Sequence, residues 1–84
     1  MAEDFDKEMQ AIAKKLRQLR IEMGYTSYRT FAHEKELSDR SLFRMESGEN
    51  FGMQTFLKTL KALEITPEDF FKDLGLEGFR LNQR

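Results

Sequence analysis

Residue types that carry catalytic or metal chemistry are sparse in this 84-residue sequence. His33 is its only histidine, and cysteine is absent. Its neighbours Glu34 and Glu36 lack the i, i+4 spacing that places two metal ligands on one face of a helix. The fifteen acidic residues are spread along the chain, as on solvated helix faces. We therefore predict no enzymatic activity, no metal site and no cofactor, and we interpret His33 as a solvated residue on a helix face.

Lysine and arginine are distributed unevenly, which points to a second kind of chemistry, the binding of anions. The formal net charge is -1. Residues 10–30 nevertheless hold five basic residues and one acid, whereas residues 31–50 hold three basic residues and five acids. Contacts of Lys and Arg with phosphates supply most of the affinity of proteins for nucleic acids. The basic stretch is therefore either a phosphate-binding surface or simply the solvated side of a helix; its bases are Lys14, Lys15, Arg17, Arg20 and Arg29.

Length and composition predict a single folded domain over residues 1–84. Hydrophobic residues make up 39% and charged residues 35%, with one Pro and five Gly, which fits a helix-rich domain and not a disordered tail. The absence of Cys excludes a disulfide framework and indicates a reducing compartment such as the cytoplasm. The apolar runs are short, so we expect no signal peptide, no membrane span and no membrane partner.

Apolar residues recurring at spacings of three and four predict a long first helix. It begins near Asp4 or Asp6, whose carboxylates can cap it, and ends at Gly24, which supplies a left-handed C-cap. Its inward stripe consists of Met9, Ile12, Leu16, Leu19 and Met23.

Two short helices follow, each beginning at a serine N-cap. The helix after Ser27 turns Phe31 and Ala32 inward and ends in the run 34–36, and the helix after Ser38 ends at Gly48. Leu42 and Met45 form the inward stripe of the second of these helices.

Two further helices complete the predicted all-α fold, a compact bundle of five. After a loop at residues 49–52, a fourth helix ends near Glu64, with the apolar stripe Met53, Phe56, Leu57, Leu60 and Leu63. Thr66 caps the fifth helix, Pro67 fits its first turn, and Glu68 and Asp69 suit the helix dipole. No alternating pattern typical of a β-strand is present.

Residues 27–48 meet the geometry of a helix-turn-helix, with two short helices around a tight turn braced by a long helix. The stretch LRQLRIEMGYTSYRTFAHEKELSDRSLFRMESG, followed by FLKTLKALEITPEDFF, resembles the lambda-repressor/Cro-type (XRE family) helix-turn-helix domain over residues 16–71. The structural positions of the family hold fitting residues: Ala32 where helices 2 and 3 cross, Leu37 in the turn, Leu42 and Met45 inside helix 3, and Leu60 and Leu63 in helix 4.

The resemblance implies that double-stranded DNA is the partner and that the third helix, about residues 38–47, lies in the major groove. Asp39 and Arg40 would face base edges at its start, and Phe43 and Arg44 one turn later. These types are chemically competent, since Arg can make two hydrogen bonds to guanine, Asp can accept one from cytosine, and Phe can press on a thymine methyl.

The resemblance also assigns phosphate contacts and one structural ion pair. Tyr28 at the start of helix 2, Ser38 at the cap of helix 3 and Asn50 in the following loop would contact phosphates. Arg20 and Glu46 match an ion pair of the family that ties helix 1 to the end of helix 3. We interpret these two residues as scaffold.

Each predicted contact residue also has a purely structural interpretation. Arg40 and Arg44 would then form a solvated face, paired with Asp39 or Glu36. Phe43 would fold over the edge of the core, and Tyr28 would cover that edge as well. An exposed Phe43 would instead invite a partner, either DNA or protein.

Departures from the family pattern predict weak binding by a monomer. Glu36 stands where many members have Gly, which indicates an altered turn, and the loop at residues 49–52 holds an acid and no base. A homodimer that binds two half-sites is the usual remedy. The candidate dimer residues are Phe71, Leu76, Phe79 and Leu81, the last three at or beyond residue 75 in the C-terminal extension 75–84.

These observations favour a small transcriptional regulator that binds double-stranded DNA sequence-specifically. The alternative is a protein-interaction module, an antitoxin-like or adaptor helix-turn-helix with weak or no DNA binding, whose protein partner would cover Phe43, Phe51 or the C-terminal apolar stretch. The acidic balance of residues 31–50 favours this alternative.

Overall fold

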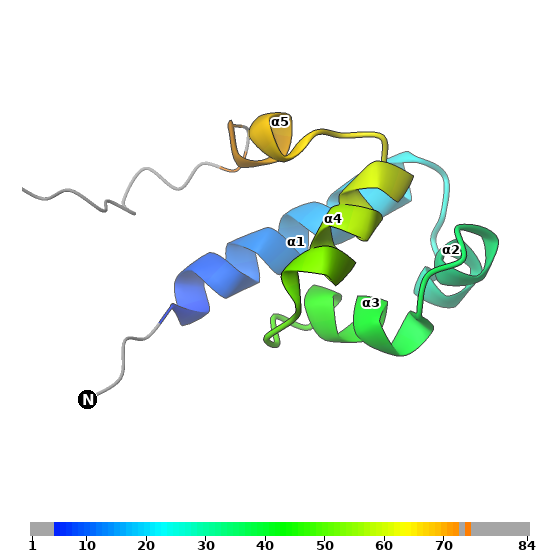
Figure 1. Ribbon diagram of the computed structural model, residues 1–84, viewed down its shortest axis with the longest axis horizontal. Coiled ribbons are helices and arrows are strands. Elements are labelled where there is room, and N and C mark those ends of the chain that lie inside the picture. The colour runs from blue at the N-terminus through cyan, green and yellow to red at the C-terminus, as the bar shows by residue number, and fades with distance from the viewer. Residues whose placement is uncertain (1–4, 73, 75–84) are drawn as a thin grey trace, which may run out of the picture.

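The structure is a computed structural model that describes residues 5–72 and 74. Over these residues it contains helices and no strand, which confirms the predicted all-α fold. In Figure 1, α2 and α3 lie on one side of the long helix α1 and α5 lies on the opposite side. No helix in this part of the chain is long and apolar enough to cross a membrane. The helices are α1 (Asp6–Glu22), α2 (Tyr28–Glu34), α3 (Asp39–Glu46), α4 (Met53–Ala62) and α5 (Pro67–Lys72).

The starts of three helices follow the predicted capping pattern. The hydroxyls of Ser27, Ser38 and Thr66 each accept a hydrogen bond from the backbone N–H three residues later, at 3.3, 3.2 and 3.1 Å. The prediction that Asp6 caps α1 is wrong, because the N-cap position is Phe5, whose side chain makes no capping hydrogen bond, and Asp4 lies outside the described residues. Asp6 lies inside the first turn, where a negative charge interacts favourably with the helix dipole.

The ends of α1 to α4 share one hydrogen-bonded motif, the Schellman motif. In each, the backbone N–H of the second residue after the C-cap bonds to the carbonyl five residues earlier, as from Leu37 to Ala32 at 2.7 Å. The residue before that donor has a positive φ, which is 104° at Gly24 and 83° at Gly48, the two predicted C-terminal glycines. Glu36 and Glu64 take the same conformation at 58° and 60°. The turn between α2 and α3 therefore keeps the geometry that a glycine favours, although Glu36 stands there.

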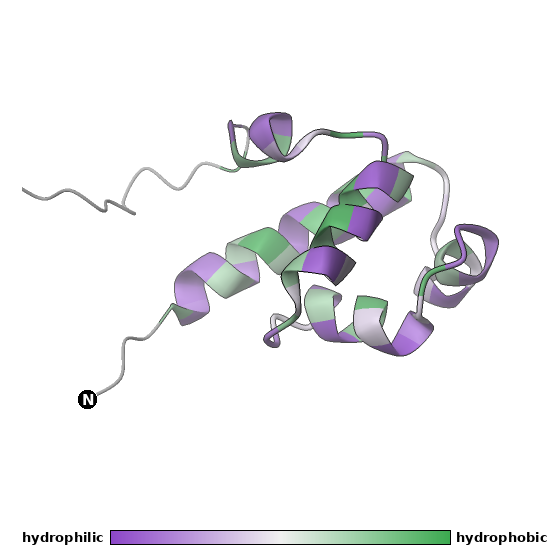
Figure 2. Ribbon diagram, viewed as in Figure 1, coloured by the Kyte–Doolittle hydropathy of each residue, from purple (hydrophilic) through white to green (hydrophobic). Residues whose placement is uncertain are grey.

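The core lies between the helices and contains most of the predicted inward residues. Hydrophobic and hydrophilic residues occupy different sides of the same helices (Figure 2). The largest buried cluster consists of Leu16, Phe31, Ala32, Leu42, Met45, Phe56, Leu60, Leu63 and Phe70. Met9, Ile12, Leu19 and Met23 of the predicted α1 stripe are only partly buried.

The predicted stripe of α4 is wrong at two positions. Met53 is 66% exposed and Leu57 is 44% exposed. The physical reason is that α4 packs against α3 and α5 with the face that carries Phe56 and Leu60. Met53 and Leu57 are four residues apart and share a neighbouring face, which the packing partners leave open.

Candidate nucleic-acid interface

Helix α3 is buried on one face and exposed on the other. Leu42 and Met45 are each 1% exposed, and they anchor α3 in the core. Arg40, Phe43 and Arg44 are all exposed. Residues three and four apart are neighbours on a helix surface, so these three side chains form one outward face. Asp39 is also exposed, at the first turn of the helix.

An aromatic pair joins this outward face to α2. Phe43 is 49% exposed, and the centroid of its ring lies 5.5 Å from that of Tyr28, with 42° between the ring planes. Tyr28, the first residue of α2, is half-buried and packs against the core. The guanidinium carbon of Arg29 lies 5.7 Å from the centroid of the Tyr28 ring. Phe43 thus points outward while Tyr28 covers the core edge.

The two arginines of this face differ in their ion pairs. Arg44 pairs with Glu49, with 3.7 Å between Nε and Oε1, and both side chains are more than half exposed. Neither Asp39 nor Glu36, the acids suggested by helical spacing, is its partner. Glu49 is placed by the Schellman motif that ends α3, because its N–H bonds to the Arg44 carbonyl at 3.0 Å. Within residues 5–72 and 74, Arg40 makes no ion pair.

Two of the three predicted phosphate contacts, Ser38 and Asn50, lie at the ends of α3. Ser38 is exposed at its N-terminal end, where its hydroxyl oxygen already accepts the capping bond from Ser41. Asn50 is exposed in the loop that follows the C-terminal end. The predicted residues Ser38, Asp39 and Asn50 therefore flank the outward face along the chain, and Tyr28 reaches it through its contact with Phe43.

A buried ion pair holds α3 against α1. Arg20 donates from Nε and Nη2 to the two carboxylate oxygens of Glu46, both at 2.8 Å, and from Nη1 to the carbonyl of Tyr25 at 2.7 Å. The two side chains are 5% and 9% exposed. The structure thus brings together the two residues that the family resemblance pairs.

Tyr25 links the loop after α1 to α2, a contact for which the sequence carries no signal. Its hydroxyl donates to Glu34 at 2.7 Å, and its ring packs edge-on against Phe31, with 5.1 Å between centroids. The hydrogen bond to Glu34 is the largest cause that raises the pKa of Tyr25, followed by burial and by the Glu34 charge. This contact braces the start of the helix-turn-helix.

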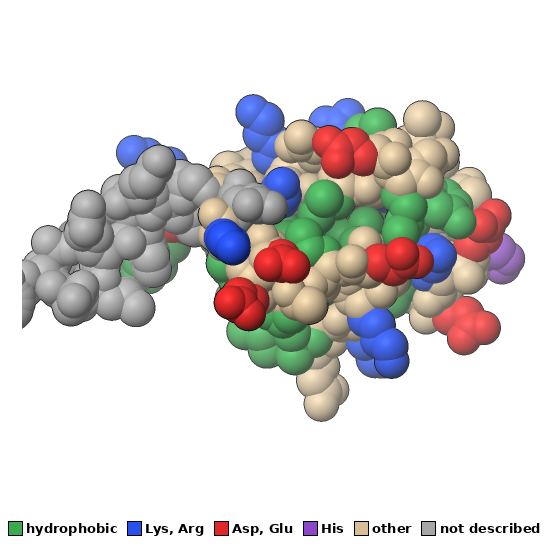
Figure 3. Space-filling model, turned by 90° about the horizontal axis from the view of Figure 1, so that it is seen from above, with side chains coloured by type: hydrophobic (Ala, Val, Ile, Leu, Met, Phe, Trp, Pro, Cys, Tyr) green, Lys and Arg blue, Asp and Glu red, His purple; other side chains and the backbone are tan. Residues whose placement is uncertain are grey.

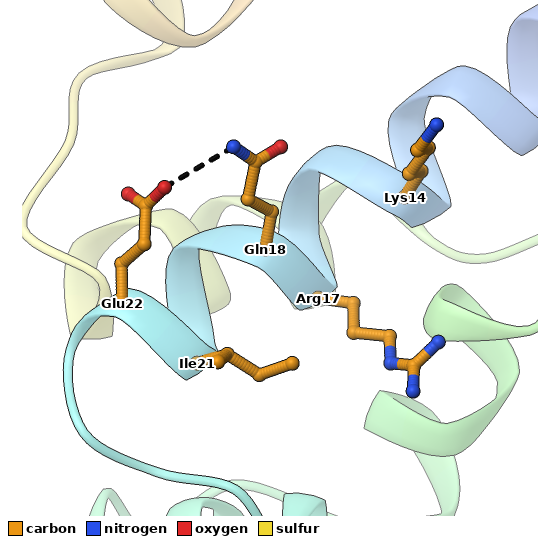
Figure 4. Close-up of a pocket in the computed structure, with 5 residues that line it drawn as sticks. All are labelled: Lys14, Arg17, Gln18, Ile21 and Glu22. Carbon is orange, nitrogen blue, oxygen red and sulfur yellow. Dashed lines mark hydrogen bonds between the residues drawn. The ribbon is translucent and has the colours of Figure 1, made fainter.

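The basic residues of α1 lie mostly away from this network. Lys14 and Arg17 line a shallow hollow on α1 together with Gln18, Ile21 and Glu22 (Figure 4). Gln18 donates to Glu22 at 3.1 Å, and in the figure Arg17 extends to a different side of the helix from this pair. Both bases are exposed, so they are free to meet solvent or an anionic partner.

Phe71, one of the residues proposed for a dimer, lies on α5. Phe71 is 46% exposed, and its ring centroid lies 5.2 Å from that of Phe70 and 5.8 Å from that of Phe56. Viewed from the side of α5, hydrophobic side chains gather in the middle of the molecule, with charged side chains of both signs around them (Figure 3). The other predicted dimer residues, Leu76, Phe79 and Leu81, lie outside the described residues.

His33 is exposed on α2, and the described part of the chain contains no cluster of three or more side chains that could hold a metal ion.

Comparison with known proteins shows the fold. No protein-family model matches the sequence, and no curated protein matches it. Among solved structures, a point mutant of the restriction-modification controller protein C.Esp1396I is similar, with a TM-score of 0.71 and 20% sequence identity over 96% of this chain and 100% of that chain. The expected architecture, a five-helix bundle with a helix-turn-helix formed by α2 and α3, is confirmed.

Proposed function

We propose that this protein binds double-stranded DNA as a small transcriptional regulator, with α3 in the major groove. The observation that carries this proposal is the outward face of α3, where Arg40, Phe43 and Arg44 are exposed on a helix whose other face is anchored in the core. The major groove admits an α-helix, and a rigid helix holds such side chains at a fixed spacing. The likeness to a restriction-modification controller protein supports a regulatory role.

The chemistry of the face supports sequence-specific binding. Arg40 and Arg44 would each donate two hydrogen bonds to O6 and N7 of a guanine, and Asp39 would accept one from a cytosine amino group. Tyr28, Ser38 and Asn50 would contact phosphates on either side and orient the helix. To bind a guanine, Arg44 must give up its ion pair with Glu49. Breaking this exposed ion pair costs about 0–1 kcal/mol.

The test is a selection of bound duplexes from genomic fragments, followed by affinity measurements on the enriched sequence. We expect an inverted repeat, and we expect Arg40→Ala and Arg44→Ala each to weaken binding by about 5- to 150-fold, the equivalent of about 1–3 kcal/mol. Lys61→Ala is the matched control, because it removes the same charge from an exposed position on α4 that belongs to neither candidate surface. Unchanged binding by both arginine variants would refute the proposal that α3 contacts the bases.

The alternative function is a protein-interaction module. The exposure of Phe43 favours a protein partner. Two acids also lie nearby, Asp39 in the first turn of α3 and Glu49 just after the end of α3. Phe51 favours it less, because its ring is half-buried and stacks on Phe56 at 5.3 Å between centroids. Salt separates the two functions, since DNA binding weakens steeply as salt rises and an apolar protein contact does not.

A further inference from the structure

The exposed ring of Phe43 is held in place, unlike most exposed side chains. Tyr28 lies against it at 5.5 Å between centroids, and Tyr28 is itself packed against the core from α2. Ring pairs at such distances are favourable beyond the area that they bury. A flat apolar surface is therefore fixed on the outward face of α3, where Phe43 is about half exposed and can meet a partner.

Two exposed arginines flank this ring along α3. Arg40 precedes Phe43 by three residues and Arg44 follows it directly, and both are exposed. Arg29 lies over the ring of Tyr28 at 5.7 Å. The nearby acids are Asp39, one turn earlier on α3, and Glu49, which pairs with Arg44. A partner that suits this surface has an apolar group set between negative charges or hydrogen-bond acceptors.

Duplex DNA offers one such group in its major groove, the methyl on C5 of thymine. Resting on the function proposed above, we propose that the Tyr28–Phe43 ring pair reads a C5-methylated pyrimidine, while the neighbouring arginines bind guanines. A methyl on C5 of cytosine occupies the same place in the groove, so the pair accepts 5-methylcytosine too. Phe43 makes the contact with the methyl group, and for this contact Tyr28 is a positioning residue that acts through its ring and not through its hydroxyl.

The experiment uses synthetic duplexes of the sequence enriched by the wild-type protein. Each thymine is replaced singly by deoxyuridine, which lacks only the methyl group. We expect one position in each half-site at which the loss of the methyl weakens binding about fourfold, as burial of one methyl-sized group predicts. At that position, a C·G pair carrying 5-methylcytosine should bind about fourfold more tightly than the same pair without the methyl.

Protein variants assign the effect to the ring pair. Phe43→Ala should bind thymine and uracil duplexes equally, whereas Arg40→Ala should weaken both and keep the difference between them. Tyr28→Phe should keep the difference and Tyr28→Ala should reduce it. Thermal unfolding of each variant checks that it is folded. We expect Phe43→Ala to remain folded, because Phe43 is about half exposed.

The outcomes separate this inference from the function on which it rests. If no sequence is enriched, both are overturned. If a sequence is bound tightly but uracil at every position leaves the affinity unchanged, or if Phe43→Ala keeps the sensitivity to the methyl, the DNA-binding function stands and the ring-pair inference is refuted. If Tyr28→Phe loses the sensitivity to the methyl group, the positioning role of the Tyr28 ring is refuted, because the hydroxyl is then the group that acts.

Discussion

At the scale of the residue, Arg20 and Arg44 make ion pairs of opposite character. The Arg20 side chain is 5% exposed and binds both oxygens of Glu46, whereas the Arg44 side chain is 59% exposed and meets Glu49 at 3.7 Å. Removing one partner of a buried pair leaves an uncompensated charge, while an exposed pair is screened by water. Arg20 therefore serves the scaffold, and Arg44 remains available to a partner.

Arg20→Ala should lower the free energy of unfolding by about 3–5 kcal/mol, because Glu46 is left buried and unpaired. Urea unfolding measures this loss. Arg17→Ala, at an exposed position on the same helix, is the control and should change stability by no more than about 0.5 kcal/mol. The double variant Arg20→Met with Glu46→Leu should recover part of the loss, since neither buried charge remains. Equal effects of Arg20→Ala and Arg17→Ala would contradict a structural role for the pair.

Glu49→Gln should tighten DNA binding about two- to fivefold, the equivalent of about 0.5–1 kcal/mol. The substitution frees Arg44 from its ion pair and removes a negative charge beside the outward face of α3. Fluorescence anisotropy on the enriched duplex measures the affinity. Glu64→Gln makes the same charge change at an exposed position after α4 and should have no comparable effect. In an Arg44→Ala background the gain should shrink, and a gain of full size there would show that Glu49 acts independently of Arg44.

At the scale of the element, the ends of the helices set the geometry of the helix-turn-helix. The Schellman motif at Glu36 returns the N–H of Leu37 to the carbonyl of Ala32, and this closes α2 so that α3 can begin at the Ser38 cap two residues later. A residue with a Cβ is strained at positive φ, so Glu36 and Glu64 carry a conformational cost that Gly24 and Gly48 do not.

Glu36→Gly should therefore stabilise the fold. Relief of about 1–2 kcal/mol of left-handed strain outweighs about 0.5–1 kcal/mol of added backbone entropy in the unfolded chain. The midpoint of thermal unfolding should rise, and Glu64→Gly should behave alike because its φ of 60° is nearly the same. Lys35→Gly, one residue earlier at φ -94°, is the control and should destabilise. A loss of stability in Glu36→Gly equal to that in Lys35→Gly would refute the strain.

At the scale of the whole molecule, the two candidate surfaces lie on opposite sides of α1. The outward face of α3 lies on the side of α2 and α3, and the exposed residue Phe71 belongs to α5 on the other side (Figure 1). A homodimer formed through α5 would leave the outward face of α3 open in both subunits. The two α3 helices of a dimer could then enter successive major grooves about 34–36 Å apart.

Phe71→Ser should convert the dimer that we predict into a monomer, because it removes an exposed apolar ring from the dimer surface. Sedimentation analysis measures the mass of the free protein and of its DNA complex, and the variant should occupy half-sites singly. Ile21→Ser, at a residue 43% exposed on α1, is the matched control and should remain dimeric. A monomeric wild-type protein, or a dimeric Phe71→Ser variant that is fully folded, would rule out this surface.

The elements could be predicted from the sequence because their causes are local. Ser27, Ser38 and Thr66 cap helices through bonds to N–H groups three residues away, and Gly24 and Gly48 end helices through their own φ angles. Spacing alone also identified the buried face of α3 at Leu42 and Met45. The family resemblance paired Arg20 with Glu46, which are 26 residues apart and which no local rule connects.

The sequence by itself therefore determined the all-α class, most helix ends and the residues that α3 turns outward. Only the tertiary structure decided which of these residues meet. The contact of Tyr28 with Phe43 joins two helices, and the exposure of Met53 and Leu57 depends on which faces of α4 its neighbours cover. Such contacts depend on how separate helices pack, and helical spacing specifies the direction of a side chain but not what stands opposite it.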